Sequence, residues 1–428
     1  MTSNAKIQIR NLYKIFGTDP KSALNFVKDG MNKDELLAKH GHVLGLNDIS
    51  VDMKEGAITV VMGLSGSGKS TLIRHINRLI EPTDGQVLID GEDALLLGTE
   101  ALREKRRSDM SMVFQKFALL PHRTVLDNSA LPLEVRGVER EERRRAAAGW
   151  LERVGLGGYE NHHPNQLSGG MQQRVGLARA LTSNSDIMLM DEAFSALDPL
   201  IRSDMQKLLL DLHLELRKTI IFITHDLDEA LRLANHLVIL KDGAIVQQGE
   251  PQSILLNPGD PYIEDFVSDI NRARVLRVKS IMEDTVSASS FAGDIEMEDN
   301  LESVIALSGG DTGHTYRVVK NGEPMGQLDM KAVMRALVPR ARIEIRKRDS
   351  ARVPGNAHRR GLRSRAEGAP GARPESCPVC KWEAGPAPAA SRPASLKPSA
   401  GESAAQAAAL LGNYLAQDEG EVSSHCLL

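Results

Sequence analysis

The chain has 428 residues, with 53 Lys and Arg against 57 Asp and Glu, and its formal net charge is −4. This balance excludes a generally basic nucleic-acid-binding protein, and three cysteines exclude a disulfide scaffold. No apolar run approaches the roughly 18 residues of a membrane span, and the polar start, MTSNAKIQIR, predicts no signal peptide. A length of 428 residues allows two or three domains at roughly 100–200 residues each.

The first elements predict an interrupted strand region. Residues 5–17 alternate in the manner of a strand, and a polar, Lys-rich stretch at 18–42 follows, in which KDELLAKH predicts a short helix. We interpret 18–42 as an insertion. Strand-like sequence resumes at Val43 and ends in the apolar run 58–62, which predicts a buried parallel strand.

Four further apolar runs, at 110–114, 187–190, 219–224 and 237–240, alternate with helix-like stretches. Strands separated by helical crossovers predict an α/β domain with a mainly parallel sheet. Residues from about 120 to 180 predict a helical subdomain inserted between sheet strands. A second, α+β unit is predicted at 275–338.

The composition changes near residue 348. Residues 349–428 hold 8 of the 19 prolines and all three cysteines, but no Ile, Phe or Met, so a disordered tail is predicted there. The Cys377–Cys380 pair has no second ligand pair at zinc spacing. The basic run 340–365 predicts a solvated segment, with anionic lipid or RNA binding as the alternative. A shifted reading frame is a further hypothesis for the tail.

A phosphate-binding loop follows the apolar run 58–62. Its sequence matches GxxxxGK[ST] between a strand and a helix-like stretch, which is the context that the motif requires. Glycines let the backbone N–H groups point inward at phosphates, and a lysine and a hydroxyl add charge neutralisation and a Mg²⁺ ligand. The expected ATP-binding residues are Gly63, Ser65, Gly66, Ser67, Gly68, Lys69, Ser70 and Thr71.

An acidic pair, Asp191 and Glu192, follows the buried run 187–190. Because parallel sheets bind ligands at the carboxyl ends of their strands, we expect Asp191 to hold Mg²⁺ and Glu192 to deprotonate the attacking water. The alternative is an acidic pair at a helix start. Gln115 and His225 also end predicted strands. We expect Gln115 near Mg²⁺ or the water, and His225 near the γ-phosphate.

One motif points to a family. Leu167, Ser168, Gly169, Gly170 and Met171 resemble the LSGGQ signature of ATP-binding cassette (ABC) ATPases, with Met171 at the usual Gln. Across residues 1–265 the motif order also fits, including the D-loop of that family at Ser195, Ala196, Leu197 and Asp198. The resemblance implies bound ATP and Mg²⁺. It also implies a head-to-tail homodimer in which each signature closes on ATP held by the other subunit. By the same resemblance Phe16 stacks on adenine, with Tyr13 as the competing candidate.

A closer resemblance is to the ATP-binding subunit of glycine betaine/proline betaine importers, the quaternary-amine, osmoprotectant class. It is carried by the 18–42 insertion and the stretches 114–128 and 191–200. It implies an ATPase that is peripheral on the cytoplasmic face of the inner membrane and that drives integral permease subunits and, through the complex, an extracytoplasmic substrate-binding protein. No specific nucleic acid is expected. The apolar cluster Phe117, Leu119, Leu120 and Pro121 would suit a permease socket, or a plain core cluster.

Residues 275–338 resemble one cystathionine-β-synthase-type (CBS) module, where this class usually has two. The alternative is a degenerate dimer-contact domain. Alternative functions are an ATPase of another amino-acid, choline or carnitine importer, a soluble non-transport ABC ATPase, and a regulatory nucleotide-binding protein. The carboxylate of Glu192 counts against the last of these.

Overall fold

The computed structural model describes residues 5–268, 270–285, 287–288 and 290–338. The strands are β1 (Ala5–Phe16), β2 (Val43–Lys54), β3 (Ile58–Met62), β4 (Asp84–Ile89), β5 (Glu92–Asp93), β6 (Met110–Val113), β7 (Ile187–Asp191), β8 (Thr219–Thr224), β9 (His236–Lys241), β10 (Ala244–Gly249), β11 (Asp294–Glu296), β12 (Thr315–Lys320) and β13 (Glu323–Asp329). The predictions for the basic run and for the tail at 349–428 lie outside the described residues.

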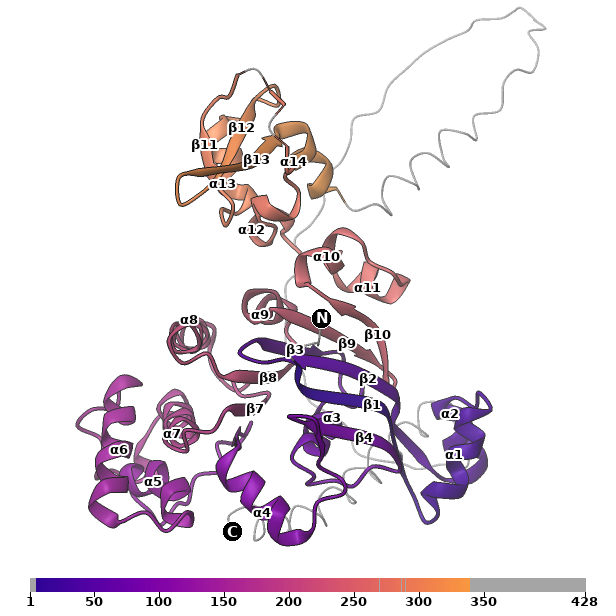
Figure 1. The fold of residues 1–428 in the computed structure, drawn as a ribbon, viewed down its shortest axis with the longest axis vertical. Helices are drawn as coiled ribbons and strands as arrows, with labels where there is room; N and C mark the ends of the chain where they lie inside the picture. The colour runs from indigo at the N-terminus through magenta and orange to yellow at the C-terminus, as the bar shows by residue number, and fades with distance from the viewer. Residues whose placement is uncertain (1–4, 269, 286, 289, 339–428) are drawn as a thin grey trace, which may run out of the picture. The chain divides into compact units, whose positions relative to one another are not determined.

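The helices lie between these strands along the chain, singly or in groups of two or three (Figure 1). They are α1 (Pro20–Lys28), α2 (Lys33–His40), α3 (Lys69–Ile76), α4 (Thr99–Ser108), α5 (Val125–Val135), α6 (Arg140–Arg153), α7 (Gly169–Thr182), α8 (Pro199–Leu216), α9 (Leu227–Leu233), α10 (Pro251–Leu256), α11 (Pro261–Phe266), α12 (Arg272–Val275), α13 (Leu301–Ser308) and α14 (Met330–Leu337), with 3-10 turns at Pro164–Gln166 and Val278–Ser280.

The central sheet has six strands in the order β10-β9-β3-β8-β7-β6. All neighbours are parallel except the edge pair β10–β9, which is antiparallel. The predicted mainly parallel α/β sheet is therefore confirmed, although β6 ends at Val113 rather than at Phe114. This strand order places the carboxyl ends of β3, β8, β7 and β6 next to one another.

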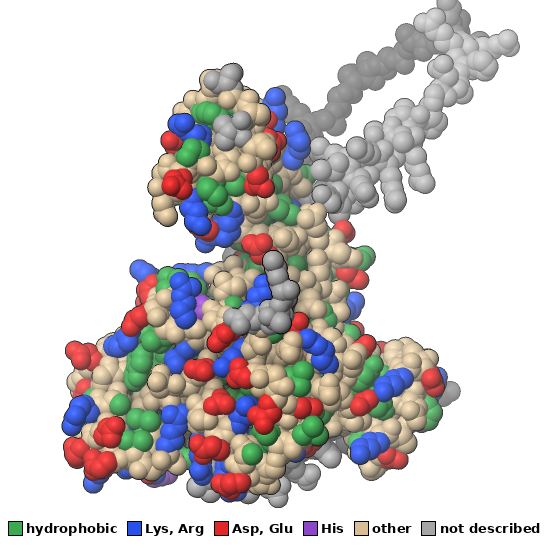
Figure 2. Space-filling view, viewed as in Figure 1, with side chains coloured by type: hydrophobic (Ala, Val, Ile, Leu, Met, Phe, Trp, Pro, Cys, Tyr) green, Lys and Arg blue, Asp and Glu red, His purple; other side chains and the backbone are tan. Residues whose placement is uncertain are grey.

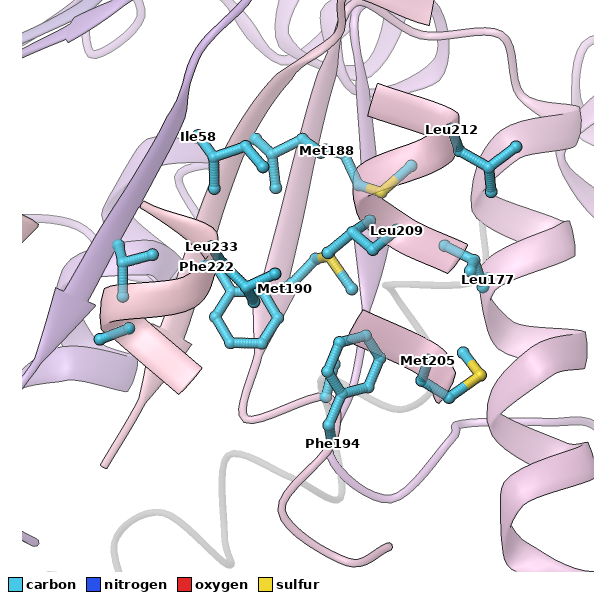
Figure 3. Packing of buried hydrophobic residues seen from close by; sticks show 14 of the residues in the cluster. Ile58, Leu177, Met188, Met190, Phe194, Met205, Leu209, Leu212, Phe222 and Leu233 are labelled. Atoms are coloured by element: carbon cyan, nitrogen blue, oxygen red, sulfur yellow. The ribbon is translucent and has the colours of Figure 1, made fainter. Parts of the chain in front are cut away.

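Strand residues alternate between two buried layers on the two faces of this sheet, which explains why the strands are continuous apolar runs. One layer includes Val60, Met62, Met188, Met190 and Phe222, and the other includes Val61, Leu189, Ile221, Ile223 and Val238. Figure 3 shows part of the first layer, in which strand side chains lie beside Leu209 of α8.

The second layer is closed by a sheet that the sequence analysis does not predict. It is antiparallel, with strand order β2-β1-β4-β5. Buried side chains of β1 and β2, such as Ile7, Ile9 and Leu46, pack in the same cluster as Leu72 and Ile73 of α3. The phosphate-binding loop and the helix after it are thereby held between two sheets.

The insertion 18–42 forms two helices, α1 and α2, rather than the one expected. Asp19 caps α1 by accepting a hydrogen bond from the Ser22 N–H, and Asn32 and Glu35 form a capping box at the start of α2. Ala23, Leu24, Val27 and Leu36 pack with Ile15 and Leu44 of the antiparallel sheet. The insertion is thus anchored by its own small core.

Two further parts complete the described chain. Helices α5, α6 and α7 contact one another and form the helical region expected near 120–180. Residues from α12 to α14 include a three-stranded sheet, in the order β11-β12-β13, with Tyr316 and Val318 buried in it. These residues combine helices with a small sheet, while the domain bounds 275–338 and the CBS-like identity stay predictions.

No helix among the described residues is long and apolar enough to span a membrane. On the face seen in Figure 2, basic and acidic side chains are intermixed over the described part of the chain. No large area of one sign stands out on that face, in keeping with the near-neutral composition.

Candidate nucleotide site

Two glycines of the phosphate-binding loop, Gly63 and Gly68, leave no room for a side chain unless their neighbours move. A Cβ added at Gly63 would lie 2.2 Å from the Leu240 carbonyl oxygen, and one at Gly68 would lie 2.6 Å from the Gly45 oxygen. Gly68 precedes α3 in a left-handed conformation, and no side chain caps the helix. The N–H groups of the first turn of α3 are therefore available to an anion. The buried Ser67 hydroxyl has no partner among the described residues.

Lys69 lies inside this loop and is only 5% exposed. Its Nζ donates to the Gly63 and Leu64 carbonyls at 2.9 and 3.1 Å and lies 3.9 Å from the Glu192 carboxylate. Burial lowers the pKa of Lys69, and the nearby carboxylates of Glu192 and Asp191 oppose that shift. A partly desolvated ammonium at this point fits a nucleotide phosphate as its counter-charge.

Ser70 and Asp191 provide a pair of hard oxygen ligands. The Ser70 hydroxyl donates to Asp191 Oδ1 at 2.9 Å. Burial raises the pKa of Asp191, and the hydrogen bond from Ser70 opposes the shift. Nowhere in the described ranges do three or more His, Cys, Asp or Glu side chains gather as metal ligands. One carboxylate and one hydroxyl suit Mg²⁺, which keeps several waters and takes its other ligands from phosphates.

Glu192 is the point where the expected catalytic side chains meet. The Gln115 side-chain amide donates to Glu192 Oε2 at 3.1 Å, and His225 Nδ1 lies 3.5 Å from the same oxygen. Glu192 has a left-handed backbone (φ 45°), and its N–H donates to the Ile223 carbonyl of β8. Such strain in a non-glycine residue is characteristic of functional sites. The structure therefore brings Gln115, Glu192 and His225 together from β6, β7 and β8.

The D-loop residues lie beside this group. Gln115 also donates to the Ser195 hydroxyl at 3.3 Å, and that hydroxyl donates to the Glu192 carbonyl at 2.9 Å. Leu197 is buried, whereas Ala196 and Asp198 are exposed. Asp198 caps α8 by accepting from the Ile201 N–H.

The signature residues lie at the start of α7, away from α3 and the phosphate-binding loop of the same chain (Figure 1). Ser168 is the N-cap of α7 and accepts from the Met171 N–H at 3.3 Å. Ser168 and Gly169 are exposed, while Leu167 is buried. A Cβ at Gly170 would lie 2.7 Å from Ile201 of α8, so this glycine allows a close approach of α7 and α8.

Phe16 and Tyr13, the two candidates for adenine stacking, differ in their surroundings. Tyr13 packs against the small core of the insertion. Phe16 lies against Gly45, where a Cβ would come within 2.7 Å of its ring, and Gly45 in turn adjoins Gly68 of the phosphate-binding loop. This geometry favours Phe16. The Lys14 ammonium lies 4.9 Å from the centre of the Phe16 ring.

The apolar cluster after Gln115 is neither a closed core nor a free surface. Phe117, Leu119 and Leu120 are half-buried, and Pro121 is exposed. Leu119 packs against the main core, so one side of the segment is anchored there.

Three residues contact the site without having been expected there. Lys33, in the insertion, donates to the Gly66 carbonyl at 3.1 Å. Arg202 donates to the Ser195 and Leu197 carbonyls and pairs with Asp226. Arg179 reaches the segment after Gln115. No local pattern marks them, because each acts on a segment that is brought close only by the fold.

A phosphate-binding loop after β3, an acidic pair at the end of β7 and a polar side chain at the end of each flanking strand define a P-loop ATPase. The ABC transporter family model matches residues 46–195, which include the loop, Gln115, the signature and Glu192.

Two relatives define the branch of this family. The chain is 55% identical over 277 residues to the glycine betaine transport ATP-binding protein OpuAA of Bacillus subtilis; the match covers 65% of this chain and 66% of that protein, just under two thirds of its length. It is 45% identical over 335 residues to the trimethylamine N-oxide transport system ATP-binding protein TmoW of Ruegeria pomeroyi, covering 78% of this chain and 97% of TmoW. The chain therefore belongs to the ATP-binding subunits of ABC transporters, and the resemblance to the glycine betaine class is confirmed.

A solved structure supports the fold. The dimeric bacterial ABC transporter cassette MJ0796 is similar with a TM-score of 0.50 and 34% identity, over 57% of this chain and 98% of that chain. The cassette part of the fold prediction is confirmed.

Proposed function

We propose that the chain is the ATP-hydrolysing subunit of an ABC importer for glycine betaine, proline betaine or a related quaternary amine. The observation that carries the ATPase assignment is the convergence of Lys69, Gln115 and His225 on the Glu192 carboxylate, beside the Ser70–Asp191 pair. Every one of these groups comes from a carboxyl end of a parallel strand or from the loop after β3.

In the proposed reaction the chain mainly positions and neutralises charge, as phosphoryl transfer requires. The loop N–H groups and Lys69 bind the β- and γ-phosphates, with Thr71 reaching the α-phosphate, and Ser70, Asp191 and Gln115 hold Mg²⁺, which supplies charge neutralisation when bound. Glu192 accepts a proton from the attacking water. His225 orients the γ-phosphate, since its ring lies next to Glu192 at the neighbouring strand end.

The active unit is proposed to be a head-to-tail homodimer. The exposed N-terminal turn of α7, with Leu167 to Met171, then closes on a nucleotide held by the partner. Support comes from the separation of α7 and α3 within one chain and from the similar cassette, whose structure is dimeric. Residues 195–198 lie beside Glu192 and would face the same interface.

The importer, its substrate and its position in the cell are inferred from the relatives. Both named relatives are ATP-binding proteins of transport systems for small methylated amines, glycine betaine and trimethylamine N-oxide. We infer that this chain works with permease subunits and a substrate-binding protein, peripherally at the cytoplasmic face of the membrane. The apolar cluster after Gln115 is the proposed permease contact: Phe117, Leu119 and Leu120, which are half-buried, and Pro121, which is exposed.

Residues 275–338 are proposed to be one CBS-like module that follows a cassette at 1–265. The 335-residue match to TmoW is longer than the cassette, so the similarity extends past it. This supports a module that accompanies the cassette in at least one relative.

The substrate is tested by complementation. The chain, or its Glu192→Gln variant, is expressed in a Bacillus subtilis strain whose OpuAA gene is deleted, and uptake of labelled glycine betaine is measured. We expect uptake with the original chain and none with the variant. If the purified chain hydrolyses ATP but restores no uptake of glycine betaine in this strain, it serves a different importer instead.

A further inference from the structure

The loop between Gln115 and α5 contains a strained turn. Phe117 and Ala118 are consecutive non-glycine residues with left-handed backbones, at φ 61° and 47°. In this conformation Cβ crowds the following carbonyl oxygen, so such a turn persists only where neighbouring groups hold it.

Arg179, near the end of α7, holds this turn. Its Nη1 donates to the Ala118 carbonyl at 2.6 Å and its Nη2 to the Phe117 carbonyl at 3.0 Å. The planar guanidinium presents two nitrogens in a fixed fork to two adjacent acceptors, a preorganised geometry that the single nitrogen of a lysine lacks. Arg179 is 6% exposed, and no carboxylate of the described residues lies within 4.0 Å of it.

This arrangement is unusual for a residue that serves packing alone. Burial lowers the pKa of Arg179 to about 10, so it remains a cation at neutral pH. A buried charge is costly unless it is fully hydrogen-bonded. Within the described chain, the acceptors for this charge are the two carbonyls of the strained turn.

The turn links two parts of the nucleotide site, Gln115 and the signature helix α7, with α5. On one side, Gln115 contacts Glu192. On the other, Leu120 exchanges two hydrogen bonds with the fully buried Asn128 of α5, at 2.7 and 3.0 Å. Between them, the turn lies along α7, where a Cβ at Gly169 of the signature would be 3.8 Å from the Phe117 ring.

We propose that Arg179 is a positioning residue that fixes the 117–118 turn, so that Gln115 reaches Glu192 and the loop stays in register with the helix that carries the signature. The proposal rests on the ATPase function proposed above. It predicts a role in the rate of hydrolysis rather than in ATP binding, because Lys69 is held by the Gly63 and Leu64 carbonyls of its own loop and not by the turn.

The test uses the full chain and a rescue. Arg179→Met removes both donors and is expected to lower kcat by about 10- to 100-fold, as misplacement of a catalytic group does, with KM for ATP changed by less than about threefold. Ala118→Gly alone should be neutral. In the Arg179→Met chain it should restore kcat by at least about threefold, since glycine adopts φ > 0 without strain.

Two variants and a second readout keep the result decisive. Ala118→Val, which leaves Arg179 in place but opposes the turn, should lower kcat like Arg179→Met, and Arg179→Lys should be intermediate. Tryptic cleavage after the exposed Lys116, followed by mass spectrometry, should be faster in Arg179→Met and slower again in the double variant.

The outcomes separate this proposal from the proposed function. If the original chain has no ATPase activity, the proposed function fails, while the rates of tryptic cleavage still test whether Arg179 fixes the 117–118 turn. Unchanged kcat and cleavage in Arg179→Met would overturn the proposal. A loss of kcat and thermal stability that Ala118→Gly does not rescue would also overturn it, because Arg179 would then serve only the stability of α7. If Arg179→Met does not fold, Ala118→Val and Arg179→Lys decide in the same way.

Discussion

Replacing Glu192 by Gln tests the centre of the proposed mechanism. The change keeps the shape of the side chain and removes its charge and its ability to accept a proton. Gln115, His225 and Lys69 lie 3.1, 3.5 and 3.9 Å from the Glu192 carboxylate, so the perturbation acts where all three meet. A general base contributes about 10²- to 10⁴-fold to a rate, and we expect kcat for ATP hydrolysis to fall by that range.

The same substitution should not weaken ATP binding. At the 3.9 Å between Lys69 Nζ and Glu192, opposite charges in a medium of effective dielectric about 20 attract by roughly 4 kcal/mol. Without that carboxylate, Lys69 is free to interact with phosphates, and one negative charge near the bound anion is removed. The Kd for ATP should therefore stay equal or decrease.

Single-turnover hydrolysis of labelled ATP measures the rate of hydrolysis, and titration with a fluorescent ATP analogue measures the Kd. Glu215→Gln is the matched control, because this exposed carboxylate on α8 pairs with Arg153 away from the site. A fall in kcat of less than about tenfold would refute Glu192 as the base, since it is below the contribution of a general base. A large rise in Kd would show instead that the substitution damages the phosphate-binding loop.

Three further outcomes are expected. Ser168→Arg, placed in the Glu192→Gln chain, should abolish the ATP-dependent dimer in light scattering while each subunit still binds ATP; a dimer that persists would place the signature elsewhere. Gly63→Ala should abolish ATP binding and lower Tm, because the new Cβ would lie 2.2 Å from the Leu240 oxygen. Gly66→Ala, which has open space around it and only the strain of a left-handed backbone at φ 76°, about 1–2 kcal/mol, should still bind ATP. Burial lowers the pKa of His75 to about 4, below its ordinary 6.5. The neutral His75 ring therefore makes its full contribution to stability above pH 6.5, and that contribution is lost as the pH falls from 6.5 towards 4. Urea unfolding should show about 2 kcal/mol less stability at pH 5 than at pH 7, and His75→Gln should remove most of that difference.

The sequence alone determined the chemistry of the site and its place on strand ends. The apolar runs before Gly63, Asp191 and His225 predicted buried strands, and the structure has β3, β7 and β8 there. The helix α1 was missed, although Asp19 and Pro20 carry an ordinary N-cap and first-turn signal. These features are readable because they depend on neighbours within a few residues.

The tertiary structure decided which strand ends meet. Only the strand order β3-β8-β7-β6 shows that Gln115 and His225 both reach Glu192. Gln115 is 77 residues from Glu192 in the sequence. Two other features also depend on residues far apart in the sequence. They are the antiparallel sheet that holds α3 and the contacts of Arg179 and Arg202 with loop carbonyls. A carbonyl oxygen is present at every position of a chain, so the sequence marks no particular one as an acceptor, and only the folded backbone selects it.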